Sequence, residues 1–192
     1  MKIGILISGR GSNMQAIVDA VQGGRIPDSE VVVVISDQPD ASGLDRAKER
    51  GVETLVIERA ERKRADHDAE IAAELTKRGV ELICLAGYMR LLSPEFIRAF
   101  PDRIVNIHPS LLPSFRGLDA QRQAFDHGVK VTGCTVHFVD EELDNGRIIA
   151  QKAVEIREND TAETLAERIL EQEHELYVEA VAKIAGKKST AE

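Results

Sequence analysis

The sequence has little cysteine, no excess of positive charge and no long hydrophobic run. Its two cysteines, Cys84 and Cys134, lie among apolar or small residues, which favours buried free thiols over a disulfide or a metal site. The formal net charge of −8 argues against nucleic acid, whose phosphates select clustered Lys and Arg. The apolar start is soon interrupted by glycine, unlike a signal peptide, and no run approaches a membrane span. We therefore expect a cytoplasmic protein that binds neither nucleic acid nor membrane.

What the chain does contain is the composition of an ordinary globular protein. Of its 192 residues, 43% are hydrophobic and 30% are charged, so the chain is long enough to form a full core. We expect a single domain over residues 1–192, with one half at residues 1–100 and the other at residues 101–192. Small anionic ligands are compatible with the negative net charge, because a local site can oppose the overall field.

Strand-like and helix-like segments alternate through the first half of the chain. The run VVVVI within Glu30–Ser36 is continuous and β-branched, as in a strand buried on both faces of a parallel sheet. Short connections favour right-handed crossovers and an α/β fold. Such sheets bind ligands at the carboxyl ends of their strands. We expect strands at residues 2–7, 30–36, 52–57, 81–87 and 131–140, and helices at residues 44–50, 66–77, 119–127 and from 161 onward.

The first predicted strand is followed by SGRGSN, with glycines at positions 9 and 11. Ser12 or Asn13 can cap the helix that follows, whose apolar face begins with Met14. A strand, a glycine turn and a helix N-terminus together form an anion site, and phosphate is its usual ligand. The pattern lacks the Walker lysine and the full dinucleotide fingerprint, so a tight turn that requires small residues is the alternative.

The segment IVNIHPSLLPSFRGLDA, residues 104–120, contains the most informative pattern. It begins as a strand that places Asn106 and His108 on one face, and Pro109 and Pro113 then end regular structure. An amide donor beside a His suits carbonyl chemistry, because one group meets a developing oxyanion while the other handles protons. For an arbitrary N-x-H pattern, a turn-capping Asn and a gap-filling His are the alternative. The apolar loop that follows favours a binding site.

Two segments of the first half have both a functional and a purely structural interpretation. Arg64 belongs to a basic cluster at a helix start, where a solvated surface is the ordinary explanation. Residues 89–92 follow a strand end and precede a Ser-Pro helix start. They offer apolar surface and backbone groups to a flat heterocycle, but from the sequence alone they equally suit a core.

The acidic segment VDEELDNG in the second half also has two interpretations. Four acids between Asp140 and Asp144 usually form a solvated loop. The Asn145-Gly146 pair, however, predicts a hairpin turn between two strands, which fixes where Asp144 can point. A carboxylate brought to His108 would orient the imidazole and favour its protonated form.

The run NIHPSLLPSFRGLDAQRQA closely resembles the signature of the folate-dependent formyltransferases, and the resemblance extends over nearly the whole chain. It implies a Rossmann-like, mostly parallel central sheet with helices on both faces and a mixed sheet in the C-terminal half. It also implies transfer of the formyl group of 10-formyltetrahydrofolate to the amine of glycinamide ribonucleotide, a step of purine (IMP) synthesis. Direct transfer is expected, without an acyl-enzyme and without a metal, by a monomer or a homodimer.

The resemblance also assigns roles to particular residues. It implies that Asn106 and His108 stabilise the formyl oxygen as it becomes an oxyanion, and that Asp144 helps to remove the proton of the attacking amine. The residues matched to binding of glycinamide ribonucleotide are Gly11, Ser12, Asn13 and Glu173, and those matched to the folate are Arg64, Met89, Arg90, Leu91, Leu92, Asn106, Asp140, Glu141, Glu142, Leu143 and Asp144. The sequence departs from many members at Val178, where they have proline.

Three other functions compete with this interpretation. Methionyl-tRNA formyltransferase shares a similar core, but it adds an RNA-binding domain and a basic surface. Formyltetrahydrofolate hydrolase usually has an extra N-terminal domain and lacks the SGRGSN loop. A non-catalytic protein that binds folate or a nucleotide is the alternative from another class, and it would not need Asn106, His108 and Asp144 together.

Overall fold

The computed structural model describes residues 1–189, with side chains described as far as Gly186, so residues 190–192 of the predicted domain lie outside the described part. Its elements alternate as the sequence predicts, and each predicted strand and helix is present within a few residues of its expected bounds. In chain order they are β1 (Lys2–Ile7), α1 (Ser12–Gln22), β2 (Glu30–Ser36), α2 (Ser42–Glu49), β3 (Thr54–Val56), α3 (Arg64–Lys77), β4 (Leu82–Leu85), α4 (Pro94–Ala99), β5 (Ile104–His108), α5 (Ala120–His127), β6 (Val131–Phe138), β7 (Ile148–Glu155) and α6 (Ala162–Ser189).

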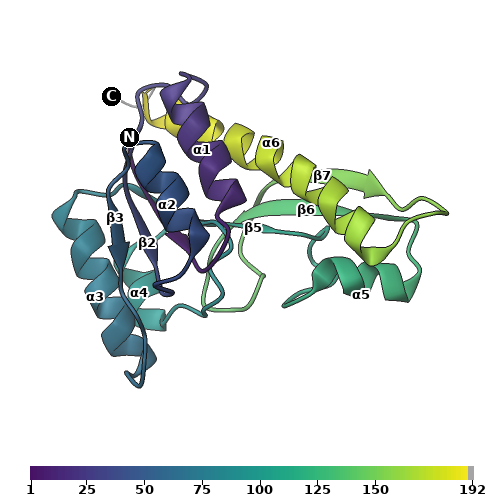
Figure 1. The fold of residues 1–192 in the computed structure, drawn as a ribbon, viewed down its shortest axis with the longest axis horizontal. Coiled ribbons are helices and arrows are strands. Elements are labelled where there is room, and N and C mark those ends of the chain that lie inside the picture. Colours follow the sequence, from purple (N-terminus) through teal and green to yellow (C-terminus); the bar gives the residue numbers. More distant parts are fainter. Residues whose placement is uncertain (190–192) are drawn as a thin grey trace.

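The seven strands form one sheet in the order β3-β2-β1-β4-β5-β6-β7 (Figure 1). Strands β1 to β5 are parallel, whereas β6 and β7 are antiparallel to their neighbours. The predicted fold class, a mostly parallel Rossmann-like sheet that becomes mixed in the C-terminal half, is therefore confirmed. The order reverses between β1 and β4, since β2 and β3 follow on one side and β5 on the other. The carboxyl ends of these two strands border the crevice where such sheets bind ligands.

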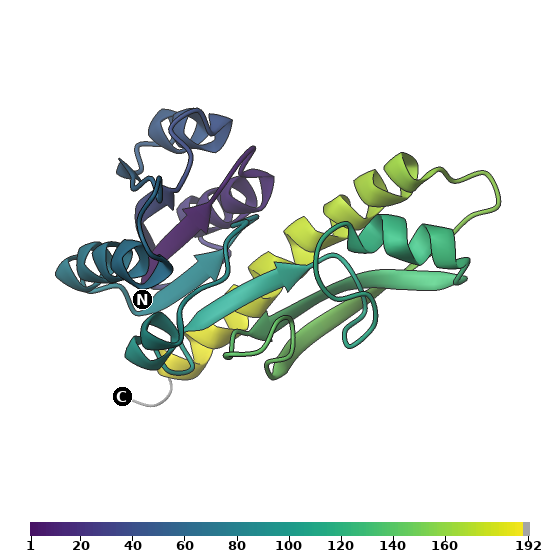
Figure 2. The ribbon, with the colours of Figure 1, turned by 90° about the horizontal axis from the view of Figure 1, so that it is seen from below.

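Helices cover both faces of the parallel part, which is why β1, β2 and β4 are almost continuously apolar and buried. One core joins the sheet to α1, α2 and α6, and a second core joins the opposite face to α3 and α4. The long helix α6 runs along the C-terminal strands and packs on β6 and β7 (Figures 1 and 2). Cys84 and Cys134 are buried and free, as predicted, and burial raises the pKa of both thiols to about 12.

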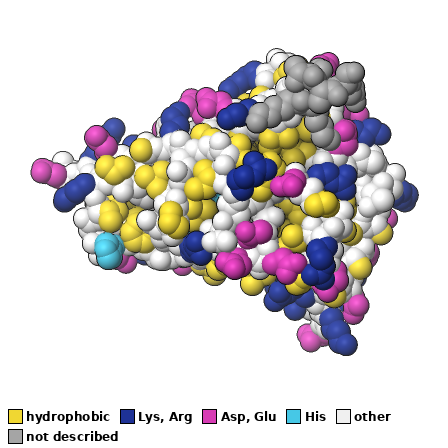
Figure 3. Space-filling view, turned by 180° about the vertical axis from the view of Figure 1, so that it is seen from behind, with side chains coloured by type: hydrophobic (Ala, Val, Ile, Leu, Met, Phe, Trp, Pro, Cys, Tyr) yellow, Lys and Arg dark blue, Asp and Glu magenta, His cyan; other side chains and the backbone are white. Residues whose placement is uncertain are grey.

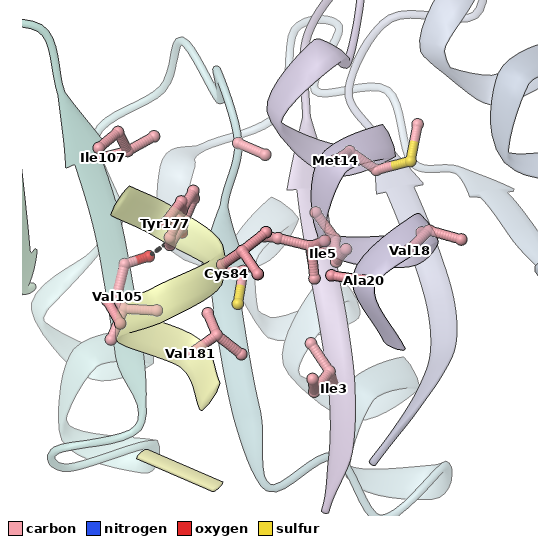
Figure 4. Close-up of a cluster of buried hydrophobic side chains, with 14 of the residues drawn as sticks. Ile3, Ile5, Met14, Val18, Ala20, Cys84, Val105, Ile107, Tyr177 and Val181 are labelled. Carbon is pink, nitrogen blue, oxygen red and sulfur yellow. Dashed lines mark hydrogen bonds between the residues drawn. The ribbon is translucent and has the colours of Figure 1, made fainter. Parts of the chain in front are cut away.

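Tyr177 on α6 contacts both β4 and β5 at the point where the two strands separate. Its ring is fully buried, and its hydroxyl lies 3.0 Å from each of two carbonyl oxygens, those of Leu85 and Val105. Figure 4 shows the contact with Val105. The pairing of the two strands ends at Leu85 and Asn106. The Tyr177 hydroxyl therefore bridges β4 and β5 next to Asn106, which directly follows Val105.

Two local predictions are wrong. Neither Ser12 nor Asn13 caps α1: the cap residue is Gly11, in the left-handed conformation with φ 68°, and no side chain caps the helix. The amide of Asn13 is engaged elsewhere, by Glu173. Strands β6 and β7 do form a hairpin, but the connection spans residues 139–147 instead of a tight Asn145-Gly146 turn. Within this loop, Glu141 pairs with Arg98 and Asp144 accepts a hydrogen bond from Gly117 N.

The surface is uneven. From behind, hydrophobic side chains gather over the C-terminal strands, at the left of Figure 3, whereas the other half carries interspersed charges of both signs. Exposed large apolar residues include Val131 and Ile148. Within residues 1–189, no helix is long and apolar enough to cross a bilayer.

Candidate active site

Three loops meet at the carboxyl edge of the sheet. The loop after β1 and the loop after β4 are joined by two hydrogen bonds, in which Ser8 N donates to Gly87 O (3.0 Å) and Met89 N donates to Ser8 Oγ (2.8 Å). The neighbouring strand β5 ends at His108. The sequence-predicted anion loop, heterocycle segment and Asn106–His108 pair thus occupy adjacent strand ends around the point where the strand order reverses.

Asn106 is oriented by a histidine on the neighbouring strand. The two residues are cross-strand partners, and Asn106 Nδ2 lies 3.3 Å from His137 Nε2. His137 Nδ1 lies 2.9 Å from the carbonyl oxygen of Phe138, an acceptor only, so Nδ1 carries the proton and Nε2 accepts from the amide. Burial lowers the pKa of His137 and keeps the ring neutral. One Nδ2 hydrogen of Asn106 is therefore engaged and the second is available to a ligand.

His108 is buried between two acceptors. Its Nε2 lies 2.8 Å from Phe115 O, and its Nδ1 lies 3.4 Å from Asp144 Oδ2. A carbonyl and a carboxylate oxygen both accept, so this surrounding is satisfied by the doubly protonated ring. The separation from Asp144 exceeds the usual hydrogen-bond range of about 2.7–3.2 Å. The contact between His108 Nδ1 and Asp144 Oδ2 is therefore mainly electrostatic.

Asp144 has an unusual backbone conformation, and a second loop holds its side chain in the site. It is a non-glycine residue with φ 48°, and its Oδ2 accepts a hydrogen bond from Gly117 N at 2.8 Å. Its Oδ1 lies 3.9 Å from His137 Nε2. The structure therefore brings together Asn106, His108 and Asp144, which are the three residues that the sequence singles out for chemistry.

The sequence does not predict the residues that hold the loop after His108 in place. Thr135 Oγ1 donates to Ser110 O (2.7 Å) and accepts from Leu112 N (3.1 Å), which fixes the loop after His108. Gln151 Nε2 reaches both Leu112 O and Thr135 Oγ1, at 2.9 and 3.0 Å. Alternation along β6 places Thr135 and His137 on one face, but only the register of β5 against β6 shows which residues they serve.

The candidate nucleotide site joins α1 to α6. Asn13 Nδ2 donates to Glu173 Oε2 at 2.7 Å, and both side chains are buried. Burial raises the pKa of Glu173, while the hydrogen bond from Asn13 acts in the opposite direction. Asn13 Oδ1 is buried and has no partner among the described residues, which leaves an acceptor for a ligand hydroxyl. Gly11 and Ser12 complete the turn in front of the α1 N-terminus.

The residues matched to the folate fall into two groups. Met89 and Leu91 are exposed, at 64% and 55%, while Leu92 is buried, so the segment presents apolar side chains to solvent. On the other side of the crevice, Glu141 is tethered to α4 through Arg98, with Nη1 and Oε1 3.0 Å apart.

The remaining matched residues are more loosely placed. Leu143 is half exposed, and Asp140 Oδ1 accepts a hydrogen bond from Glu142 N (3.0 Å) within the loop. Arg64 begins α3 on the surface, and its side chain has no hydrogen bond or ion pair with another described residue. The structure does not bring Arg64 into contact with the other candidate residues.

Two further observations concern the surroundings of the site. A cavity of about 430 Å³ lies beside the loop after His108, between Leu111, Phe115 and His127, and it includes none of the candidate catalytic side chains. Among the described residues, no group of three or more His, Cys, Asp or Glu side chains is arranged to hold a metal ion.

Comparison with known proteins identifies the class to which this fold and site belong. The family model described as formyl transferase matches residues 1–181, and the chain belongs to this family. Phosphoribosylglycinamide formyltransferase of Bacillus subtilis is 42% identical over 186 residues, which cover 96% of this chain and 95% of that protein. The crystal structure of glycinamide ribonucleotide transformylase 1 from Symbiobacterium toebii is 54% identical, with a TM-score of 0.95, over 97% of this chain and 88% of that one.

Some relatives are much longer than this chain. The trifunctional purine biosynthetic protein adenosine-3 of Bos taurus is 45% identical over 187 residues, which cover 96% of this chain and 18% of that protein. The chain spans less than a fifth of such trifunctional relatives. The family expected from the NIHPSLLPSFRGLDAQRQA run is confirmed.

Proposed function

We propose that this chain transfers the formyl group of 10-formyltetrahydrofolate to the primary amine of glycinamide ribonucleotide, giving formylglycinamide ribonucleotide and tetrahydrofolate. The observation that carries the proposal is the convergence of Asn106, His108 and Asp144 at one strand end of a formyl transferase fold. The relatives named for this activity, at 42% and 54% identity over nearly the full chain, favour it over the hydrolase and the non-catalytic alternative.

The chemistry follows from the donors around the formyl carbon. The amine of the nucleotide attacks this carbon, and the carbonyl oxygen becomes an oxyanion. The free Nδ2 hydrogen of Asn106 and the neighbouring His108 imidazole stabilise the oxyanion, and one such donor contributes roughly 100- to 1,000-fold. The intermediate then collapses with cleavage of the bond to N10 of the folate. The enzyme needs no nucleophile of its own, because the substrate supplies the amine.

Two protons must move during this exchange. The attacking amine loses one, and N10 of the departing tetrahydrofolate gains one. Asp144 is the carboxylate placed to receive the first, through water, since Oδ2 is already engaged by Gly117 N. Asp144 Oδ2, which lies 3.4 Å from His108 Nδ1, also orients the His108 ring beside the oxyanion.

Binding is divided between the two halves of a single domain. In residues 1–100, Gly11, Ser12 and Asn13 present backbone amides and the α1 dipole to the phosphate, and Met89–Leu92 receive the pterin. In residues 101–192, Glu173 binds the ribose and the loop at Asp140–Asp144 encloses the folate. Arg64, on the surface, meets the charged tail of the folate. The protein acts as a monomer or homodimer in the cytoplasm and uses no metal.

A three-arm assay tests this function. Deformylation of 10-formyltetrahydrofolate is followed spectrophotometrically with glycinamide ribonucleotide, with methionyl-tRNA or with no acceptor. We expect loss of the formyl group only in the first arm, with formylated nucleotide recovered. Loss without an acceptor would instead establish a hydrolase, and binding of both ligands without turnover would establish a non-catalytic protein.

A further inference from the structure

The segment Tyr88–Ser93 is held in place without regular secondary structure. It lies between β4 and α4, and the exposed Met89 and Leu91 protrude from it. An irregular segment with exposed apolar side chains loses conformational entropy when it is ordered, so something must hold it. Two buried carboxylates do so: one binds the Arg90 side chain and the other binds the backbone of Ser93.

Asp37 holds Arg90. It directly follows β2, its side chain is 1% exposed, and its Oδ2 accepts from Arg90 Nε at 2.8 Å and from Gln38 Nε2 at 2.9 Å. Ser8 Oγ, in the loop after β1, accepts a hydrogen bond from Met89 N at 2.8 Å. Burial by itself raises the pKa of Asp37, but the hydrogen bonds from Arg90 and Gln38, together with the charge of Arg90, act against burial, and the pKa is lowered. Asp37 is therefore ionised and paired with Arg90.

Asp68 holds Ser93. It lies in the first turns of α3, is 1% exposed, and accepts a hydrogen bond from Ser93 N at 2.6 Å. Its other oxygen lies 3.4 Å from His67 Nδ1, and His67 Nε2 lies 2.7 Å from Ile57 O. The Ser93 hydroxyl in turn caps α4 by accepting from Phe96 N.

The two carboxylates serve one segment, although they come from different elements. Burial, followed by the charges of Asp37 and Asp68, raises the pKa of the Tyr88 hydroxyl. Buried carboxylates stabilise a fold less than well-packed apolar residues of similar size would, because of their desolvation cost. Their presence beside an irregular, exposed segment indicates a demand for one backbone conformation there.

We propose that Asp37 and Asp68 are positioning residues that hold the Tyr88–Ser93 segment in the conformation that receives the formyl folate. The inference rests on the proposed function, since that function assigns the folate to Met89–Leu92. The Arg90 guanidinium is directed to Asp37, so this residue offers its backbone, and not its charge, to the ligand. The segment is ordered before the folate arrives, and binding does not have to supply that ordering.

The test separates folate binding from turnover. Asp37→Asn and Asp68→Asn should each raise the KM for 10-formyltetrahydrofolate about 10- to 100-fold, the range expected for a lost charge-assisted hydrogen bond. The kcat at saturating folate and the KM for glycinamide ribonucleotide should change less than about threefold. Arg90→Gln, at a side chain 37% exposed, should reproduce the effect from the other partner of the pair. Combined with Asp37→Asn it should add little, because both remove one interaction.

A second readout follows the segment itself. Trypsin cleavage after Arg90 should be faster in Asp37→Asn than in the wild type, because the clamped guanidinium is released. Asp19→Asn is the matched control, since it breaks another Asp–Arg pair, with Arg50 Nε at 2.6 Å, on the surface of α1. It should leave both the folate KM and cleavage after Arg90 unchanged.

The outcomes separate this proposal from the proposed function. An unchanged folate KM in both variants, or equal losses in kcat and both KM values with a lowered Tm, would overturn the positioning role. If the wild type shows no transfer but binds tetrahydrofolate in calorimetry, the proposed function fails, and weaker binding by the variants still supports the positioning role. If the wild type binds no folate while cleavage after Arg90 responds, the segment is ordered for another purpose and the positioning proposal falls.

Discussion

His108 Nδ1 lies 3.4 Å from Asp144 Oδ2, while Nε2 of the same ring lies 2.8 Å from Phe115 O. The loop that carries Phe115 also supplies Gly117 N, which donates to Asp144. One loop thus fixes the imidazole and the carboxylate relative to each other. The pair is preorganised by backbone groups, and its charge can be altered without removing the contacts that hold it.

Asp144→Asn should lower kcat by roughly 100- to 10,000-fold, the range for loss of acid–base assistance. The amide can still accept from Gly117 N, so the loop should keep its place and the Tm should change little. Steady-state kinetics with both substrates measure the effect. Asp126→Asn, which alters an exposed carboxylate on α5, is the control and should retain wild-type kcat. A kcat in Asp144→Asn equal to that control would remove Asp144 from the mechanism.

His137→Ala should lower kcat about 10-fold, because a hydrogen bond of about 1–1.5 kcal/mol no longer orients the Asn106 amide. Asn106→Ala removes the oxyanion donor itself and should cost roughly 100- to 1,000-fold. Since His137 acts through Asn106, the double variant should be no slower than Asn106→Ala alone. Additive losses would show that His137 has an independent role. The nucleotide KM, measured alongside, should stay near wild type in each variant.

The sequence predicts most of the fold because buried strands and short connections leave few alternatives. The continuous run VVVVI and the glycines that end the helices are local signals, and each predicted element is present. The sequence also predicts that Asn106 and His108 act together, because alternation along a strand places both on one face. Asp144 was predicted through an Asn145-Gly146 turn that does not form, although its contact with His108 does.

The rest of the site depends on contacts between segments far apart in the chain. His137 matters because β5 and β6 pair in one register, which no local pattern specifies. Asn13 was expected to cap α1, but its amide binds Glu173 on α6, where the two side chains are buried together. Asp37 and Asp68 gave no signal at all, since a single acid after a strand or in a first helical turn is ordinary.

Gly11→Ala should raise the KM for glycinamide ribonucleotide and destabilise the protein. Gly11 has φ 68°, and a Cβ there would lie 3.0 Å from Met14 Cε and 3.1 Å from Gly43 Cα, so the turn in front of α1 must shift. Gly24→Ala is the matched control: its φ is 74°, but a Cβ would meet nothing within 4 Å. Both variants should lose about 1–2 kcal/mol for the left-handed backbone. Only Gly11→Ala should weaken nucleotide binding. Equal nucleotide KM values in the two variants would show that the turn at Gly11 does not bind the phosphate.

Glu173→Gln should separate stability from nucleotide binding. Burial raises the pKa of Glu173 above its ordinary 4.5, so the folded state holds this proton to higher pH than the unfolded state. Stability is therefore lost as pH rises from about 4.5 through the folded pKa. Glutamine removes that loss and can pair reciprocally with Asn13, whose Oδ1 has no partner among the described residues.

The Tm of Glu173→Gln at neutral pH should accordingly equal or exceed that of the wild type, by about 2–4 °C for each kcal/mol regained. Its KM for glycinamide ribonucleotide should rise, since the ribose loses a carboxylate acceptor. Thermal melts of both proteins at pH 4.5 and pH 7.5 show directly whether the substitution raises or lowers the Tm. A variant less stable than the wild type at pH 7.5 would show that ionised Glu173 stabilises the fold.

The two tyrosines of the chain offer a final test of what the buried hydroxyls do. Tyr177→Phe removes the hydroxyl that contacts the carbonyls of both Leu85 and Val105, and each hydrogen bond contributes about 0.5–1.5 kcal/mol. At about 2–4 °C per kcal/mol, the Tm should fall by roughly 2–12 °C. Tyr88→Phe removes a buried hydroxyl that has no partner among the described residues, so its Tm should stay constant or rise. Equal losses of Tm would show that packing around the rings, and not the Tyr177 hydroxyl, holds the ends of β4 and β5 together.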